Sequence, residues 1–205
     1  MMKRCWVLFL LLFANVAVFA QVKPIYFYGN QIVSDPNKAT SYGVFGKISN
    51  EDIWVLKRYN LYDELLSTGS FKDESLTIEH GDFVFYSYVQ DFNDEYLTHF
   101  SIKDKYRFVA QKGKFDNGLE TGEWIWYFPT GNVMTILTYE KGVKNGPFYN
   151  YDRSGNVIQS GKYLNGEKEG EWLYNRGRDK EFYIMGVPQG ESKKQNQPKA
   201  SSTIN

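Results

Sequence analysis

Cysteine and histidine are almost absent from this chain of 205 residues, which holds one cysteine and two histidines. The cysteine, Cys5, stands near the N-terminus, so the rest of the chain has no thiol for a disulfide or for covalent catalysis. His80 and His99 show none of the spacings typical of zinc ligands. These absences argue against a disulfide scaffold, a thiol enzyme and a zinc site.

An excess of charge of one sign is also lacking, because 24 basic residues balance 24 acidic ones and no basic block occurs. The chain therefore has no electrostatic footprint for nucleic acid. A nucleophile elbow, a phosphate loop and a dinucleotide fingerprint are missing as well. We predict no cofactor.

Acidic residues cluster in two segments, 72–80 and 91–95, which we expect to be polar loops. Acids on exposed loops are typically solvated and lack the raised pKa that general-acid catalysis requires. The clustered residues are Asp73, Glu74, Asp91, Asp94 and Glu95. Their placement predicts a protein that is not an enzyme.

Long apolar runs are limited to Cys5–Phe19, which follows Lys3 and Arg4 and precedes a small residue, Ala20. This run is shorter than the roughly 20 residues that span a bilayer. A short basic start, an apolar stretch and small residues before a cleavage point are typical of a signal peptide, here residues 1–20. The alternative is an uncleaved N-terminal anchor. We expect an exported protein, either periplasmic or secreted at the cell envelope.

Aromatic residues are abundant: 32 of the 36 Phe, Trp and Tyr residues follow residue 20, and the chain has 18 glycines. Aromatic residues favour strands, and glycine and asparagine favour turns. The composition predicts an all-β protein of many short strands.

A repeat of 24 residues organises the C-terminal half, from about residue 108 to 187. Glycines, aromatic residues and tyrosines each recur in register. The recurring positions are Gly118, Gly142 and Gly166; Gly122, Gly146 and Gly170; Trp124, Phe148 and Trp172; and Tyr127 with Tyr151. Residues 122–128 read as a strand, the turns at 129–132 and 153–156 follow strands, and 133–139 and 157–163 return as partners. Each unit is thus a hairpin.

These motifs resemble the MORN repeat, in particular a 24-residue variant found in exported bacterial proteins and in proteins described as antitoxin components. The best match is Tyr163–Trp172, and the middle unit departs from the pattern with Pro147 and Phe148. The resemblance implies an elongated, mostly single-layer antiparallel meander of hairpins.

Residues 21–107 contain a leader segment and diverged hairpin units. Leu65–Phe71 matches Val157–Tyr163, and Gly81–Tyr86 matches Gly122–Tyr127. We therefore expect the sheet to continue upstream of the clear repeats. Residues 188–205 are polar, and we predict a disordered tail there.

The aromatic residues give the strongest indication of function. The column Trp124, Phe148 and Trp172 is expected to stack across hairpins as the core. Aromatic residues outside that column are candidates for a binding face, since exposed aromatic patches mark contact with a protein, a glycan or a membrane surface. These candidates are Trp126, Phe128, Tyr149 and Tyr174.

We expect an exported protein-binding or scaffold module at the cell envelope. Two alternatives are an immunity or antitoxin-like protein that binds a toxin, implied by the resemblance alone, and a glycan-processing or glycan-binding protein with a site in the loops 72–80 or 91–95.

Overall fold

The computed structural model describes residues 24–48 and 51–190. The predicted signal peptide lies outside the described residues, and so does the predicted tail beyond residue 190. Within the described part, Val187–Pro188 forms a last short strand.

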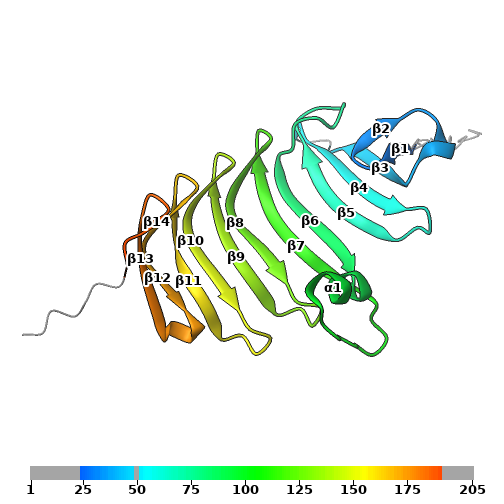
Figure 1. The fold of residues 1–205 in the computed structure, drawn as a ribbon. Coiled ribbons are helices and arrows are strands. Elements are labelled where there is room, and N and C mark those ends of the chain that lie inside the picture. The colour runs from blue at the N-terminus through cyan, green and yellow to red at the C-terminus, as the bar shows by residue number, and fades with distance from the viewer. Residues whose placement is uncertain (1–23, 49–50, 191–205) are drawn as a thin grey trace, which may run out of the picture.

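Residues 24–48 and 51–190 form one antiparallel sheet of fourteen strands, whose arrangement is shown in Figure 1. The strands are β1 (Ile25–Tyr28), β2 (Gln31–Val33), β3 (Ser41–Lys47), β4 (Trp54–Asn60), β5 (Leu65–Phe71), β6 (Gly81–Tyr88), β7 (Arg107–Asp116), β8 (Leu119–Tyr127), β9 (Val133–Glu140), β10 (Val143–Tyr151), β11 (Val157–Leu164), β12 (Glu167–Tyr174), β13 (Asp179–Ile184) and β14 (Val187–Pro188). From β3 to β14 each strand pairs with the next along the chain, whereas β1 lies between β2 and β3. The predicted all-β hairpin meander is confirmed.

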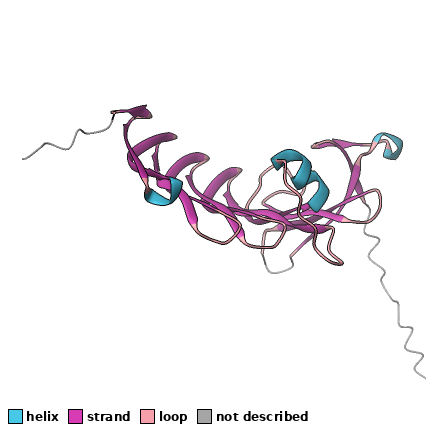
Figure 2. Cartoon of the chain, turned by 60° about the horizontal axis from the view of Figure 1, so that its bottom comes forward, coloured by secondary structure: helices cyan, strands magenta, loops and turns pink. Residues whose placement is uncertain are grey.

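Helical structure is limited to α1 (Val89–Tyr96) and two 3₁₀ turns, Pro36–Lys38 and Asn175–Gly177, in the described residues. The sheet is a curved layer, and α1 lies against one side of it (Figure 2). No helix in residues 24–48 or 51–190 combines the length and the apolar character that crossing a membrane requires.

Tight turns connect successive strands at one end of the strands. Both central residues of each turn have positive φ, which is the type I′ geometry that suits the twist of a hairpin. These turns are Asn117 and Gly118, Lys141 and Gly142, Asn165 and Gly166, and Met185 and Gly186. Each turn glycine also donates its N–H to the preceding hairpin; Gly142, for example, bonds the Glu120 carbonyl at 2.9 Å. The backbone thereby links successive units.

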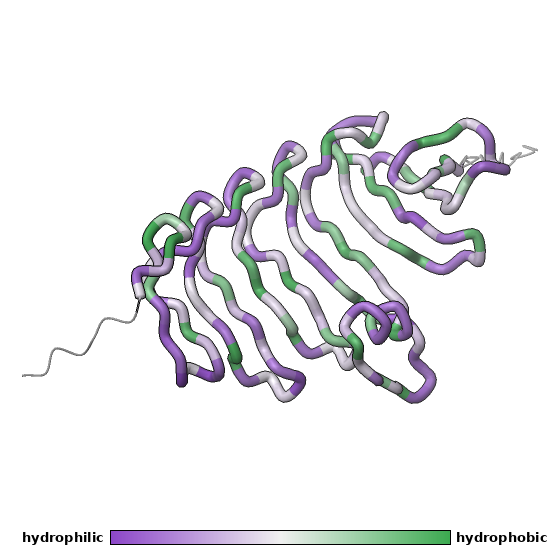
Figure 3. The backbone as a smooth tube through the Cα atoms, viewed as in Figure 1, coloured by the Kyte–Doolittle hydropathy of each residue, from purple (hydrophilic) through white to green (hydrophobic). Residues whose placement is uncertain are grey.

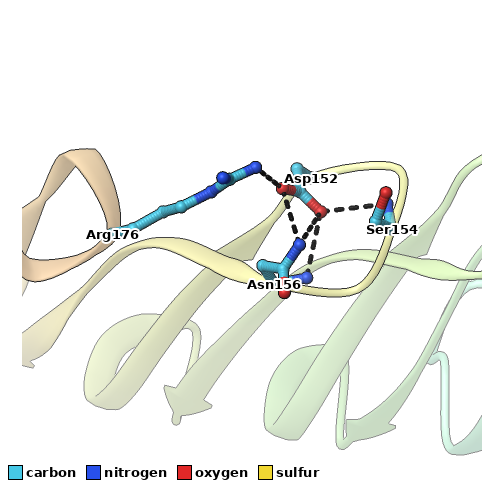
Figure 4. Close-up of polar contacts among 4 residues, drawn as sticks. All are labelled: Asp152, Ser154, Asn156 and Arg176. Atoms are coloured by element: carbon cyan, nitrogen blue, oxygen red, sulfur yellow. Dashed lines mark hydrogen bonds and ion pairs between the residues drawn. The ribbon is translucent and has the colours of Figure 1, made fainter.

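Two turns at the opposite end of the strands are closed by side chains. The Asp152 carboxylate accepts the N–H groups of Ser154 and Asn156 at 2.9 and 3.0 Å and pairs with Arg176 (Figure 4). In the diverged half, Asn60 takes the same place, because its side-chain oxygen accepts the N–H groups of Tyr62 and Glu64 at 2.9 Å.

Successive side chains of a strand point to opposite faces of the sheet. Hydrophobic and hydrophilic residues follow one another at short intervals along the strands (Figure 3). We call the side that carries Trp124 the aromatic face and the side that carries Ile125 the opposite face. Phe83, Trp124, Phe148 and Trp172 occupy one row of the aromatic face, as the strand registers show. Trp172 is 0 % exposed and Trp124 is 4 % exposed, although the strands of the described residues form one sheet with no second sheet over these rings.

Glycines on neighbouring strands explain how these rings become buried. A Cβ atom on Gly161 would lie 2.3 Å from the Trp172 ring, and one on Gly113 would lie 2.2 Å from the Trp124 ring. Each large ring therefore lies flat over a glycine of the preceding strand. Leu137 stands at this position in the middle unit, where the smaller Phe148 is only half-buried.

Segment 91–95 was predicted to be a loop, and this prediction is wrong because the segment belongs to α1. Val89 and Phe92 lie three residues apart and are both buried, in a cluster with Phe108 and Phe128 that joins the helix to the sheet. Residues 72–80 do form a loop between β5 and β6, apart from a single β-bridge between Phe71 and Glu79. Strands β4 to β6 continue the sheet upstream of the clear repeats, as expected.

Candidate functional site

The candidate binding residues do not share one surface. Register places Trp126 beside Thr135, then Asn150, Gln159 and Tyr174, so Trp126 and Tyr174 stand in one row of the aromatic face. This row also contains Gln111 of β7. It runs beside the buried ring row and consists of half-buried amides, a hydroxyl and two aromatic rings.

Tyr149 and Phe128 are exceptions to the predicted binding face. Tyr149 pairs with Ile136, which pairs with Ile125, so the tyrosine belongs to the opposite face. Phe128 follows β8 and is buried at 9 % exposure under α1. Phe128 therefore helps to hold the helix and offers no surface to a partner.

A cleft of about 240 Å³ lies between α1 and the aromatic face around Trp126. Six of its lining residues are aromatic: Phe85, Phe92, Tyr96, Phe108, Trp126 and Tyr127. Its polar lining residues include Gln111 and Ser87 from the sheet and Glu95 from α1, and no lysine or arginine is among the described residues that line it. Burial, and then the negative charge of Glu95, raises the pKa of the Tyr96 hydroxyl. The cleft thus combines aromatic walls with a single carboxylate.

Tyr174, at the far end of the row, already contacts a cation. The Lys168 ammonium lies 4.4 Å from the centroid of the Trp172 ring, 5.3 Å from that of Tyr174 and 4.8 Å from that of Tyr183. It also donates a hydrogen bond of 2.8 Å to the Tyr174 hydroxyl. Three rings of the last unit therefore enclose a lysine of the same chain.

The opposite face carries a shallow depression of about 480 Å³ over β6, β7 and β8. Val84 and Ile125 supply its apolar surface. Its charged residues are of both signs: Asp82, Lys112, Lys114 and Glu123. Lys114 and Asp82 already pair at 3.5 Å with both side chains exposed, so this depression favours no ligand of one charge.

The other acidic residues named in the sequence have structural or exposed positions. Asp73 closes the loop 72–80 by accepting hydrogen bonds from Ser75, Thr77 and the Ile78 N–H, and these bonds, with Ser75 first, hold the pKa of its carboxyl far below the ordinary value. Asp91 and Asp94 are exposed on α1, as is His99 in the segment after it. The Nδ1 atom of His80 lies 3.3 Å from the Oδ1 atom of Asp116. Within the described ranges, no three His, Cys, Asp or Glu side chains gather as a metal site.

Neither the known family models nor the curated proteins contain a match to this chain. The geometry of the site therefore carries the functional argument. Sequence reasoning missed Gln111, Glu120 and Lys168 and gave Glu95 a place on a loop. A signal for two of them exists in the repeat, since positions 120, 144 and 168 hold Glu, Lys and Lys in one column.

Proposed function

We propose that this chain is an exported protein-binding module that holds a partner on its aromatic face, beside α1. The cleft around Trp126 carries this proposal, because aromatic residues in a partly enclosed site are typical of the centre of a protein interface. The row from Gln111 to Tyr174 extends the surface with groups that donate and accept hydrogen bonds. Aromatic walls with a single carboxylate suit binding better than acid–base chemistry.

Site-specific photo-cross-linking in the native cells tests the site. A benzoylphenylalanine at position 126 should capture one discrete protein, and the same probe at position 149 on the opposite face should not. Trp126→Ala should then weaken the purified complex about 30-fold or more, as removal of a central aromatic residue does, while Tyr149→Ala leaves it unchanged. Capture from position 149 alone would place the interface on the opposite face and contradict the proposal.

Export is the second part of the proposal, and the pattern of residues 1–20 supports it. Mass spectrometry of the chain recovered from its native cells should find Gln21 at the N-terminus. A chain that begins at Met1 and stays in the cytoplasm would contradict this part alone.

A further inference from the structure

The three rings that enclose Lys168 have counterparts two units earlier. Trp124 and Trp126 stand 48 residues before Trp172 and Tyr174. Tyr139 pairs with Gly122 as Tyr183 pairs with Gly170. The ring spacings agree, since Trp124 lies 6.4 Å from Tyr139 and 6.5 Å from Trp126, against 6.1 and 6.4 Å in the last unit. The first unit therefore repeats the ring arrangement that receives a lysine.

The residue that would supply the lysine differs in the first unit. Glu120 stands at the position of Lys168, and each pairs with the aromatic residue of the preceding strand, Phe115 or Tyr163. Burial, and then the charge of Glu120, raises the pKa of the Tyr139 hydroxyl. In the part of the chain that the structure describes, no cation lies over the rings of Trp124, Trp126 or Tyr139. The register position that holds a lysine in the last unit thus holds a carboxylate residue in the first.

We propose that the rings around Trp126 receive a lysine or arginine side chain of the partner protein, in the way that the last unit receives Lys168. This inference rests on the proposed function and names the chemistry of its partner. Glu120 from the strand supplies a carboxylate for the charged end, Glu95 from α1 lines the adjoining cleft, and the half-buried rings of Trp126 and Tyr139 supply their electron-rich faces. A cation is attracted to the electron-rich face of an aromatic ring. A neutral side chain would leave the Glu120 carboxylate without an opposite charge, and an acidic side chain would be repelled by it.

The test uses the full chain and two short peptides, acetyl-Gly-Gly-Lys-Gly-Gly-amide and the same peptide with norleucine. Norleucine keeps the aliphatic stem and lacks the charge. NMR titration follows the indole N–H signals, with Trp126 assigned from the Trp126→Phe variant. The lysine peptide should shift the Trp126 signal and bind about fivefold more tightly than the norleucine peptide. Equal binding of the two peptides, or no binding of the lysine peptide, overturns the inference.

Glu120→Lys provides the sharpest variant because it places in the first unit the lysine that the last unit already has. The new ammonium should occupy the rings and weaken the lysine peptide at least tenfold. Glu123→Lys is the matched control, because it makes the same change of charge on the opposite face three residues away, and it should weaken binding by less than twofold. Equal effects of the two variants would mean that only net charge matters and would overturn the inference.

The outcomes separate this inference from the proposed function. If position 126 captures a partner and Trp126→Ala abolishes the complex, but the lysine peptide does not bind, the binding module stands and the cationic side chain is wrong. If position 126 captures nothing while the lysine peptide binds, the partner has been assigned to the wrong face although the rings do accept a cation.

Discussion

The diverged half of the sheet, β3 to β6, and the repeat half, β7 to β12, build one architecture from different residues. In the repeat half, Trp124 and Trp172 lie over Gly113 and Gly161. In the diverged half, Phe83 lies over Gly69, where an added Cβ would be 2.2 Å from the ring. The pair of ring and glycine is therefore shared, while the identity of the ring is not.

The connections between strands differ between the junction of the two halves and the repeat half. The connection between β6 and β7 contains α1 and a long segment, whereas the hairpins that follow are joined by short turns. Because α1 covers the aromatic face at this junction, the cleft lies where the diverged half meets the repeat half. The regular units supply a continuous surface, and the irregular insertion gives one part of it a distinct shape.

The largest expected loss of folding stability comes from removing a buried aromatic ring in each half. Trp172→Ala should destabilise the fold by about 3–5 kcal/mol, because Trp172 is fully buried and its loss leaves a cavity. Phe83→Ala should cost a similar amount if the diverged half depends on the same core, since Phe83 is 6 % exposed. Phe148→Ala, at a half-buried ring, should cost less. Urea unfolding followed by circular dichroism measures all three, and a loss below about 1 kcal/mol for Phe83→Ala would show that the halves are not equivalent.

The next largest loss of folding stability comes from adding a methyl group at the glycines beneath the rings. Gly161→Ala and Gly69→Ala should each destabilise the fold by about 1–3 kcal/mol, because the new methyl group would overlap a ring that has little room to move. Gly46→Ala on β3 is the control, since no atom lies within 4 Å of its added Cβ, and it should be neutral. Combining Gly161→Ala with Trp172→Phe should cost less than the sum of the two changes. Strict additivity would argue against contact between ring and glycine as the cause.

The sheet could be predicted because its rules are local and repeated. Glycine, aromatic and turn positions recur every 24 residues, and the matches of Leu65–Phe71 and Gly81–Tyr86 to later units extended the sheet upstream. The helix α1 was missed because a segment of eight residues has only two buried positions, Val89 and Phe92. A helix that short depends on tertiary packing and leaves a weak pattern in the sequence.

The binding face was only partly predictable for a related reason. The repeat columns separate the two faces, since 126, 150 and 174 form one column and 125, 149 and 173 another, and this rule would have excluded Tyr149. The burial of Phe128 does not follow from any column, because it depends on the missed helix. The cleft combines residues from α1 with residues from β6 to β9, so no single sequence motif predicts it.

The smallest expected effect is a difference between the two halves in how folding stability depends on pH. The backbone N–H of Asn156, followed by its side chain and by Arg176, lowers the pKa of the Asp152 carboxyl to about 2, against about 3.9 in an unfolded chain. Because the folded value is the lower one, the stability that Asp152 contributes is present above about pH 4 and is lost as the pH falls toward 2.

Asn60 closes the corresponding turn of the diverged half, and its side-chain amide also donates to the Glu64 carboxylate at 2.5 Å. Hydrogen bonds from Tyr88 and then from Asn60 lower the pKa of Glu64. Asp152→Asn should keep most of the stability at pH 7 and lose part of the decline between pH 4 and pH 2. Asn60→Asp should destabilise the fold at pH 7, because it sets a second carboxylate against Glu64, and this cost should shrink at pH 3, where one of the two carboxylates is protonated. Urea unfolding at pH 7 and pH 3 measures both variants against the parent chain. If Asn60→Asp instead widens the difference between the two pH values, the turn at Asn60 can hold a carboxylate as the turn at Asp152 does, and the two halves would share their turns as well as the rings and their glycines.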